Sequence, residues 1–281
     1  MAGELIAYIR RTVVVGVDGT EPALRAVRWG AREAVRRGGA LRLVIATVAP
    51  VFQPMGLDQV GPSRARDAIA GAAVESLDEA ADVAADVAPG VEIVRQVRGG
   101  SAPVALHAES EWAGLVVVGT RGRGPMRTVV LGSVAAATAA TALCPVVVVR
   151  GEIEPRTDRA GADTAGVVVP ADGSAAGRRA TAFAYEEARR RGSGLLVVHA
   201  GCAVVPPDDR IAGGDPQVPI RHVADPADAE SALVTASSGA ALLVVGVQPR
   251  RRSLGGPAGR LCRSLLRTAH CPVAVVRTSA G

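Results

Sequence analysis

The sequence predicts an α/β protein built from two tandem copies of an open parallel sheet flanked by helices. Three observations lead to this fold class. Short apolar runs alternate with segments of helical periodicity. The apolar runs at 115–118 and 146–149 are joined by a glycine loop and an alanine-rich helix, which makes a strand–helix–strand unit. The second half of the chain also repeats the first, as shown below.

The first copy opens with the apolar run Val13–Val17, which is typical of a buried parallel strand. Thr20 is placed to cap the helix that follows, and Pro22 lies near the first helical position, where proline is tolerated. Gly38 and the glycine after it end this helix, and a second strand is expected at 41–48.

The middle of the first copy is expected to hold a long acidic helix at 63–87, after a loop at 49–62. A third strand at 91–97 and a helix at 103–111 then lead to the strand at 115–118. The expected apolar stripe of the acidic helix consists of Ala70, Val74, Leu77 and Ala81.

The internal repeat follows from two alignments. Asp172 falls on Asp18 at an offset of 154 residues, and Gly246 falls on Gly119 at an offset of 127. The second copy is therefore 27 residues shorter between those points, upstream of its third strand, and has lost most of the counterpart of the acidic helix. Its residues 204–217 are expected to form a loop. The repeat predicts a first domain at 1–150, a polar linker at 151–164 and a shortened second domain at 165–281.

The chemistry that the glycine loop suggests is phosphate binding. Glycines let backbone N–H groups approach an anion without interference from a Cβ, and a helix N-terminus favours negative charge. On the glycines alone, a glycine-rich surface turn before a capped helix explains the pattern equally well. The small residues of this stretch are Gly119, Gly122, Gly124, Gly132 and Ser133, with Arg121 and Arg123 adding positive charge.

Composition excludes several classes of function. The chain of 281 residues contains no lysine, which removes a P-loop lysine, a Schiff-base lysine and the lysine of a protein kinase. The net charge is +5, but aromatic residues make up 2% and acidic residues interleave with the arginines, which argues against nucleic-acid binding. The four cysteines show no C-x-x-C spacing and the four histidines no metal-ligand spacing, so a reduced cytoplasm is the simplest setting.

A membrane span is also rejected. Residues 128–149 carry no charge, which is long enough to suggest a span. However, they include glycine, serine, threonine and proline, and the matching helix of the second copy carries Arg260, Arg263 and Arg267.

The spacing Gly119-x2-Gly122-x9-Gly132-Ser133 resembles the nucleotide-binding signature of the universal stress protein family, G-x2-G-x9-G-[S/T]. The frame also matches, with a strand ending in Val-Gly before it and a Cys-Pro-Val-Val-Val strand after it. The resemblance implies two Rossmann-like domains, each with a five-stranded parallel sheet. It implies ATP as the ligand, with any accompanying Mg²⁺ held mainly by the phosphates, and a regulatory role without catalytic residues or metal ligands.

Carried over to this sequence, the resemblance gives a set of candidate binding residues. Asp18 would contact the nucleoside, although by itself it is better explained as a helix-capping or turn aspartate. Ala46 would pack on the adenine. The phosphates would be lined by Gly119, Gly122, Gly132 and Ser133, with the backbone N–H of Val134 and with Thr120, Arg121 and Gly124 as secondary candidates.

The second copy departs from this motif. Pro249 replaces Gly122, Arg251 replaces Gly124, and Arg260 replaces Ser133. Proline supplies no N–H, and an arginine obstructs close approach to the backbone, so this copy is not expected to hold a nucleotide in the family's manner. The alternative is that residues 250–252, all arginine, form a new anion site.

The sequence therefore predicts a cytoplasmic, ATP-binding stress-response regulator that holds nucleotide in its N-terminal domain only. A homodimer and an unidentified protein partner are expected, but neither nucleic acid nor a membrane. Two alternatives stay open. One is a weak ATP hydrolase, although no carboxylate lies near the glycine loop. The other is a scaffold that binds no nucleotide and works through the apolar edges at 146–149 and 273–276.

Overall fold

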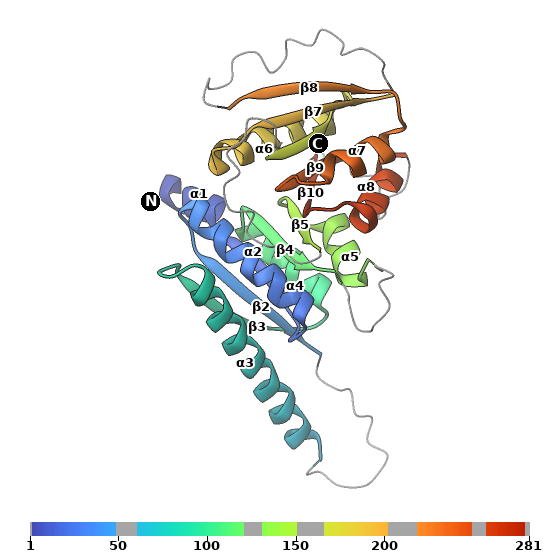
Figure 1. Cartoon of the computed structure of the whole chain (residues 1–281). Helices are drawn as coiled ribbons and strands as arrows, with labels where there is room; N and C mark the ends of the chain where they lie inside the picture. Colours follow the sequence, from blue (N-terminus) through green and yellow to red (C-terminus); the bar gives the residue numbers. More distant parts are fainter. Residues whose placement is uncertain are drawn as a thin grey trace. The chain divides into compact units, whose positions relative to one another are not determined.

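A computed structural model describes residues 2–48, 61–120, 131–150, 166–201, 218–248 and 257–278. The chain forms two compact units, Met1–Gly119 and Thr120–Gly281, which are described separately (Figure 1). The units do not follow the sequence repeat. The last helix and strand of the first copy belong to the second unit, because that strand pairs with the last strand of the second copy.

The unit Met1–Gly119 contains a parallel sheet with the strand order β3-β2-β1-β4. The strands are β1 (Val13–Val17), β2 (Leu41–Thr47), β3 (Ile93–Gly99) and β4 (Leu115–Gly119). The helices are α1 (Ala2–Arg11), α2 (Glu21–Arg37), α3 (Gly61–Val87) and α4 (Ala102–Glu109), followed by the 3-10 turn η1 (Ser110–Trp112). All the strands and helices predicted for this part of the chain are present, with ends shifted by at most a few residues.

Local sequence signals set the ends of α2 as predicted. Thr20 is the N-cap residue and a proline lies in the first turn. Gly38 ends the helix in a left-handed conformation with φ of 58°. Residues with a Cβ tolerate this conformation poorly. The strand before it is buried throughout its first three residues, as a continuous apolar run predicts.

The buried face of α3 differs from the predicted stripe. Leu77 and Ala81 are buried, but Ala70 is exposed and Val74 is 50% exposed. The buried face instead consists of Ala73, Leu77, Ala80, Ala81 and Ala84. Alanine occurs on every side of this helix, so its apolar pattern fits several faces, and contact with α2 and the sheet selects one of them.

The strand order of this unit creates a switch point between β1 and β4. The chain first moves outward from β1 to β2 and β3, and then returns to β4 on the other side of β1. Right-handed connections place α2 and α3 on one face of the sheet and α4 on the other. Open α/β sheets bind ligands beyond the carboxyl ends of the strands at such a point.

The unit Thr120–Gly281 contains a sheet with the strand order β8-β7-β6-β9-β10-β5. The strands of the second copy, β6 (Val167–Pro170), β7 (Leu195–Ala200), β8 (Ile220–Asp225), β9 (Leu242–Val247) and β10 (Val273–Arg277), are all parallel, as predicted. The remaining strand is β5 (Val146–Val149), and the helices are α5 (Ser133–Thr141), α6 (Ala175–Arg191), α7 (Ala229–Ser237) and α8 (Pro257–Thr268). The expected loop at 204–217 lies outside the described residues.

The last strands of the two copies pair with each other. β5 runs antiparallel to β10, with Val147 opposite Ala274, and all of β5 is buried. The two apolar edges identified in the sequence therefore cover one another within the chain, which removes exposed edges that would otherwise pair with other proteins.

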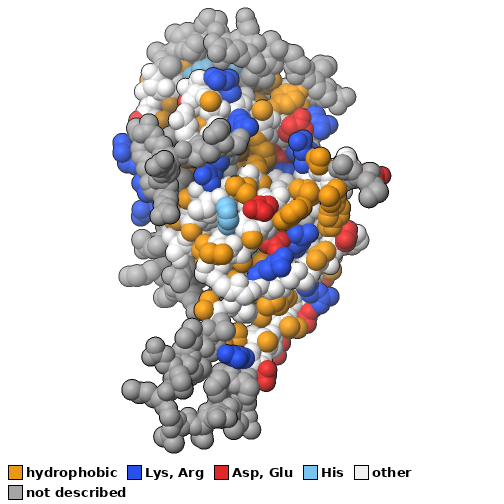
Figure 2. All heavy atoms as spheres, turned by 180° about the vertical axis from the view of Figure 1, so that it is seen from behind, with side chains coloured by type: hydrophobic (Ala, Val, Ile, Leu, Met, Phe, Trp, Pro, Cys, Tyr) orange, Lys and Arg blue, Asp and Glu red, His pale blue; other side chains and the backbone are white. Residues whose placement is uncertain are grey.

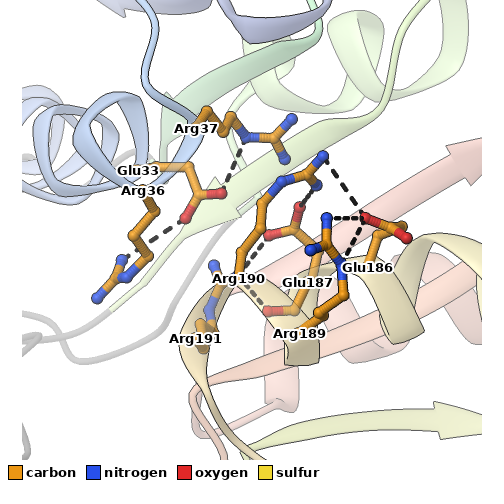
Figure 3. Close-up of polar contacts among 8 residues, drawn as sticks. All are labelled: Glu33, Arg36, Arg37, Glu186, Glu187, Arg189, Arg190 and Arg191. Atoms are coloured by element: carbon orange, nitrogen blue, oxygen red, sulfur yellow. Dashed lines mark hydrogen bonds and ion pairs between the residues drawn. The ribbon is translucent and has the colours of Figure 1, made fainter. Parts of the chain in front are cut away.

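Each copy also buries a glutamate near the end of its first helix. Glu33 is fully buried in α2, and its Oε1 accepts a 2.9 Å hydrogen bond from Arg37 Nε. Glu187 is fully buried in α6 and accepts hydrogen bonds from Arg190, at 3.0 Å, and from Arg191 (Figure 3). Arg189, Arg190 and Arg191 lie in the last turn of α6, and Gly192 ends the helix with φ of 59°.

Among the described residues, no helix has both the length and the apolar character needed to cross a membrane.

Candidate functional site

Asp18 lies directly after β1 and forms a turn. Its Oδ1 accepts hydrogen bonds from the backbone N–H of Thr20, at 3.1 Å, and from the Thr20 hydroxyl, while Gly19 adopts φ of 69°. Asp172 makes the same turn in the second copy, with Oδ1 2.9 Å from the N–H of Ser174. The aspartate therefore has a structural role in both copies. Oδ2 of Asp18, which has no hydrogen bond to the described residues, is the oxygen left for a ligand.

Ala46 lies at the same edge of the sheet as Asp18. Val17 is in register with Ile45. The next residues along β1 and β2, Asp18 and Ala46, are therefore neighbours. α3 adds a residue that the sequence did not reveal. A Cβ at Gly19 would lie 2.9 Å from Ser76 Oγ, so this hydroxyl stands beside the turn. No motif marks Ser76, because its position depends on how α3 packs.

Gly119 ends β4 and lies against the start of α2. A Cβ at this position would come within 2.3 Å of the carbonyl oxygen of Pro22. The same arrangement recurs in the second copy, where a Cβ at Gly246 would lie 2.4 Å from the carbonyl oxygen of Ala176. Close packing of strand against helix therefore explains this motif glycine without a ligand.

Thr120 and the middle of the glycine loop are the next candidates for contact with the phosphates. Thr120 is buried, and its backbone N–H donates a 3.2 Å hydrogen bond to the carbonyl of Val149, so this amide is already used. Arg121, Gly122 and Gly124 lie outside the described residues.

The end of the motif forms the N-terminus of α5, as predicted. Gly132 is the N-cap residue in an extended conformation, and it has no side chain to cap the helix. The first intrahelical hydrogen bond runs from the N–H of Ala136 to the carbonyl of Gly132, at 2.9 Å. The backbone N–H groups of Ser133 and Val134 lie before Ala136 in the helix and have no intrahelical acceptor. Such N–H groups bind phosphate at helix N-termini.

The matching helix of the second copy begins differently. α8 starts at Pro257, so Arg260, which replaces Ser133, is already the fourth residue of the helix. Pro249 and residues 250–252 lie outside the described residues. The unit therefore presents helix-start amides at α5, while the corresponding position in α8 carries a long cationic side chain.

The remaining polar features are the possible metal ligands, a pair of histidines and the charged surface residues. The described residues contain no group of three His, Cys, Asp or Glu side chains that could hold a metal ion. His199 is buried on β7, with Nε2 3.0 Å from Nδ1 of His222 on the neighbouring strand β8. On the face shown in Figure 2, arginine side chains lie in several separate places and some have acidic neighbours.

The chain with this geometry matches a known protein family. The model of the universal stress protein family matches residues 10–150 and 208–277. The chain belongs to the universal stress protein family. Both copies of the repeat are included in the match, so the tandem organisation predicted from the sequence is part of this membership.

Universal stress proteins of mycobacteria resemble the whole chain. One from Mycobacterium tuberculosis H37Rv is 32% identical over 295 residues, covering 95% of this chain and 97% of the relative. One from Mycolicibacterium smegmatis is 31% identical over 289 residues, covering 94% and 96%. The crystal structure of a universal stress protein from Archaeoglobus fulgidus, 16% identical, covers 95% of this chain and 98% of its own with a TM-score of 0.75, which shows the shared fold.

Proposed function

We propose that this universal stress protein is an ATP-binding regulator of the stress response that holds nucleotide through its first copy only. The observation that carries the proposal is the uncapped start of α5 at the end of the motif. Among the described residues, the amides of Ser133 and Val134 have no side-chain or intrahelical acceptor, and the helix dipole adds positive potential there.

The proposal also assigns residues of the unit Met1–Gly119 to the nucleoside. Asp18 directly follows β1 and Ala46 lies near the carboxyl end of β2, at the edge where such sheets bind ligands. In this proposal Asp18 Oδ2 accepts a hydrogen bond from the nucleoside, Ala46 packs on the adenine, and Ser76 is an additional contact. The glycine at 122, which lies outside the described residues, supplies a further phosphate amide.

The second copy supports the restriction to one site. It keeps Asp172, which forms a turn, and Gly246, which packs against α6, so both residues are explained by the fold. It loses the motif residues that the fold does not explain and that ligand binding would. Arg260 replaces Ser133 and Pro249 replaces Gly122.

Two matched variants test the proposal. ATP binding is measured by isothermal titration calorimetry for the wild type, Asp18→Ala and Asp172→Ala. Both variants lose the same turn, so both should lose the same modest stability. Only Asp18→Ala should weaken ATP binding, by roughly tenfold, because it removes a charged hydrogen-bond acceptor.

Gly122→Pro provides a second test, because it removes a backbone N–H from the phosphate loop. It should abolish ATP binding while leaving the melting temperature near that of the wild type. The proposal fails if the wild type takes up no adenine nucleotide at millimolar concentration, or if Asp172→Ala weakens binding as much as Asp18→Ala.

The remaining parts of the proposal concern setting and assembly. We propose a cytoplasmic, non-catalytic protein, in keeping with the buried thiols of Cys262 and Cys271, which form no disulfide among the described residues. Because β5 and β10 cover each other, the proposed homodimer must use another surface. ATP hydrolysis above a no-protein control would favour the weak hydrolase, and a protein partner bound equally by wild type and Gly122→Pro would favour the nucleotide-independent scaffold.

A further inference from the structure

A pocket of about 400 Å³ lies on the unit Thr120–Gly281, and its lining includes Leu131, the residue before Gly132 of the first copy's motif. One wall is Leu131, two residues before α5, and the other is a single side of α8. The residues of α8 that line it are Arg260, Arg263, Ser264 and Arg267. A volume of this size is within the range of pockets that hold small molecules.

The three arginines share one side of α8 because of their spacing. Positions 260, 263 and 267 are three and four residues apart, which places their side chains along one face of a helix. All three are exposed, whereas Cys262, Leu265 and Leu266 are fully buried on the opposite side. The opposite face holds α8 to the rest of the unit, so the arginines are free to face a ligand.

Positive charge in the pocket is not neutralised by the described part of the chain. None of the three arginines forms an ion pair with a described residue. Ser264, which also lines the pocket, donates its hydroxyl hydrogen bond to Glu230 of α7. Three like charges within two helical turns repel one another, which disfavours the helix unless an anion lies among them.

The first copy shows that this kind of helix does not need the arginines. The residues of α5 that correspond to Arg260, Arg263 and Arg267 at the offset of 127 are Ser133, Ala136 and Ala140. α5 forms and buries its inner face without any charged residue. The arginine face of α8 is therefore an addition to the second copy rather than a requirement of its fold.

We infer that this pocket, defined by Leu131, Arg260, Arg263, Ser264 and Arg267, binds a linear oligophosphate group. A guanidinium pairs with two phosphate oxygens at once, which suits arginine to this chemistry. The outer two arginines are seven residues apart, about 10 Å along the helix axis, so they match a chain of several phosphoryl groups better than a single phosphate. The ligand is either a free inorganic oligophosphate or the phosphate chain of a nucleoside triphosphate.

The test measures the binding of inorganic tripolyphosphate to the full chain by calorimetry. The variant Arg263→Ala/Arg267→Ala removes two pocket charges from exposed positions. The control Arg10→Ala/Arg66→Ala removes the same charge from exposed positions on α1 and α3. Wild type and control should bind tripolyphosphate with one site, and the pocket variant should bind at least tenfold more weakly.

Equal weakening in the control would show a net-charge effect and overturn the inference, as would unchanged binding in the pocket variant. Loss of tripolyphosphate binding in Gly122→Pro instead would assign the anion to the first copy's motif and also overturn it. A titration with ATP separates the two ligand sources. A second ATP site that disappears in the pocket variant identifies a nucleoside triphosphate, and a single ATP site unaffected by that variant identifies a free oligophosphate.

Discussion

Gly119 and Pro22 are in such close contact that no side chain fits between them. A Cβ on Gly119 would lie 2.3 Å from the Pro22 carbonyl oxygen. The second copy preserves this contact between Gly246 and Ala176 while it loses the other small residues of the motif. One residue of a ligand-binding signature is thus required by the packing of a strand against a helix in both copies.

Gly119→Ala and Gly246→Ala should each destabilise the protein by about 1–3 kcal/mol, because the added methyl group forces the backbone of strand and helix apart. Urea unfolding of the purified variants measures this. Gly71→Ala is the control, since a Cβ at that helical position meets nothing within 4 Å. It should be neutral or slightly stabilising. Equal stability of all three variants would show that the contact with Pro22 is not constraining.

Glu187→Ala should cost about 3–5 kcal/mol of unfolding free energy. The substitution leaves Arg191, which is 6% exposed, as a buried charge without this partner. Glu186→Ala is the neighbouring control, because Glu186 is 45% exposed and its pair with Arg189 lies in solvent. That change should cost at most about 1 kcal/mol. Chemical denaturation compares the two, and a similar cost for both would contradict the role given to the buried carboxylate.

The two buried cysteines should make the protein lose stability at alkaline pH. Burial raises the pKa of the Cys262 and Cys271 thiols from 9.0 to about 12. As the pH rises above 9, the unfolded chain releases these protons first, so the stability present below pH 9 falls until about pH 12. Each thiol contributes a slope of up to about 1.4 kcal/mol per pH unit.

Urea unfolding measured from about pH 8 to about pH 11 tests this slope, because the thiols of the unfolded chain titrate within this range. Cys262→Ala should show a shallower decline than the wild type. Cys144→Ala, at a half-buried position, is the control and should follow the wild type. A decline that is the same in all three proteins would remove the thiols as its cause.

The buried face of α3 can be checked with a pair of truncations. Leu77→Ala should destabilise by about 2–5 kcal/mol, because Leu77 is 3% exposed and its loss leaves a cavity. Val74→Ala should change stability by less than about 0.5 kcal/mol, because Val74 is 50% exposed. Thermal unfolding distinguishes them, and a larger effect for Val74→Ala would restore the stripe predicted from the sequence.

The sequence predicted most elements because their signals are local. A continuous apolar run such as Val13–Val17 needs no knowledge of its neighbours to be recognised as a buried strand, and Gly38 marks a helix end through its own backbone. The prediction for α3 was less accurate, because alanines on every side of a helix leave its orientation to tertiary contacts. Ser76 was missed for the same reason.

For the candidate site, the sequence predicted where the motif residues lie more accurately than what each residue does. Gly132 and Ser133 begin α5 as predicted, since a small residue before an alanine-rich segment is a local signal. The use of the Thr120 amide by Val149 could not be foreseen, because that hydrogen bond joins residues far apart in the chain. The nucleotide assignment of Asp18 and Ala46 stays a prediction.

By itself, the sequence determined the tandem repeat, the strands and helices of both copies, and the motif that only the first copy retains. These properties depend on residue type and spacing within short segments. Only the tertiary structure decided that β5 pairs with β10, that Gly119 is a packing glycine, and that α8 and Leu131 enclose a pocket of arginines. Each of these depends on atoms from distant segments coming within a few ångströms, and no local pattern encodes such contacts.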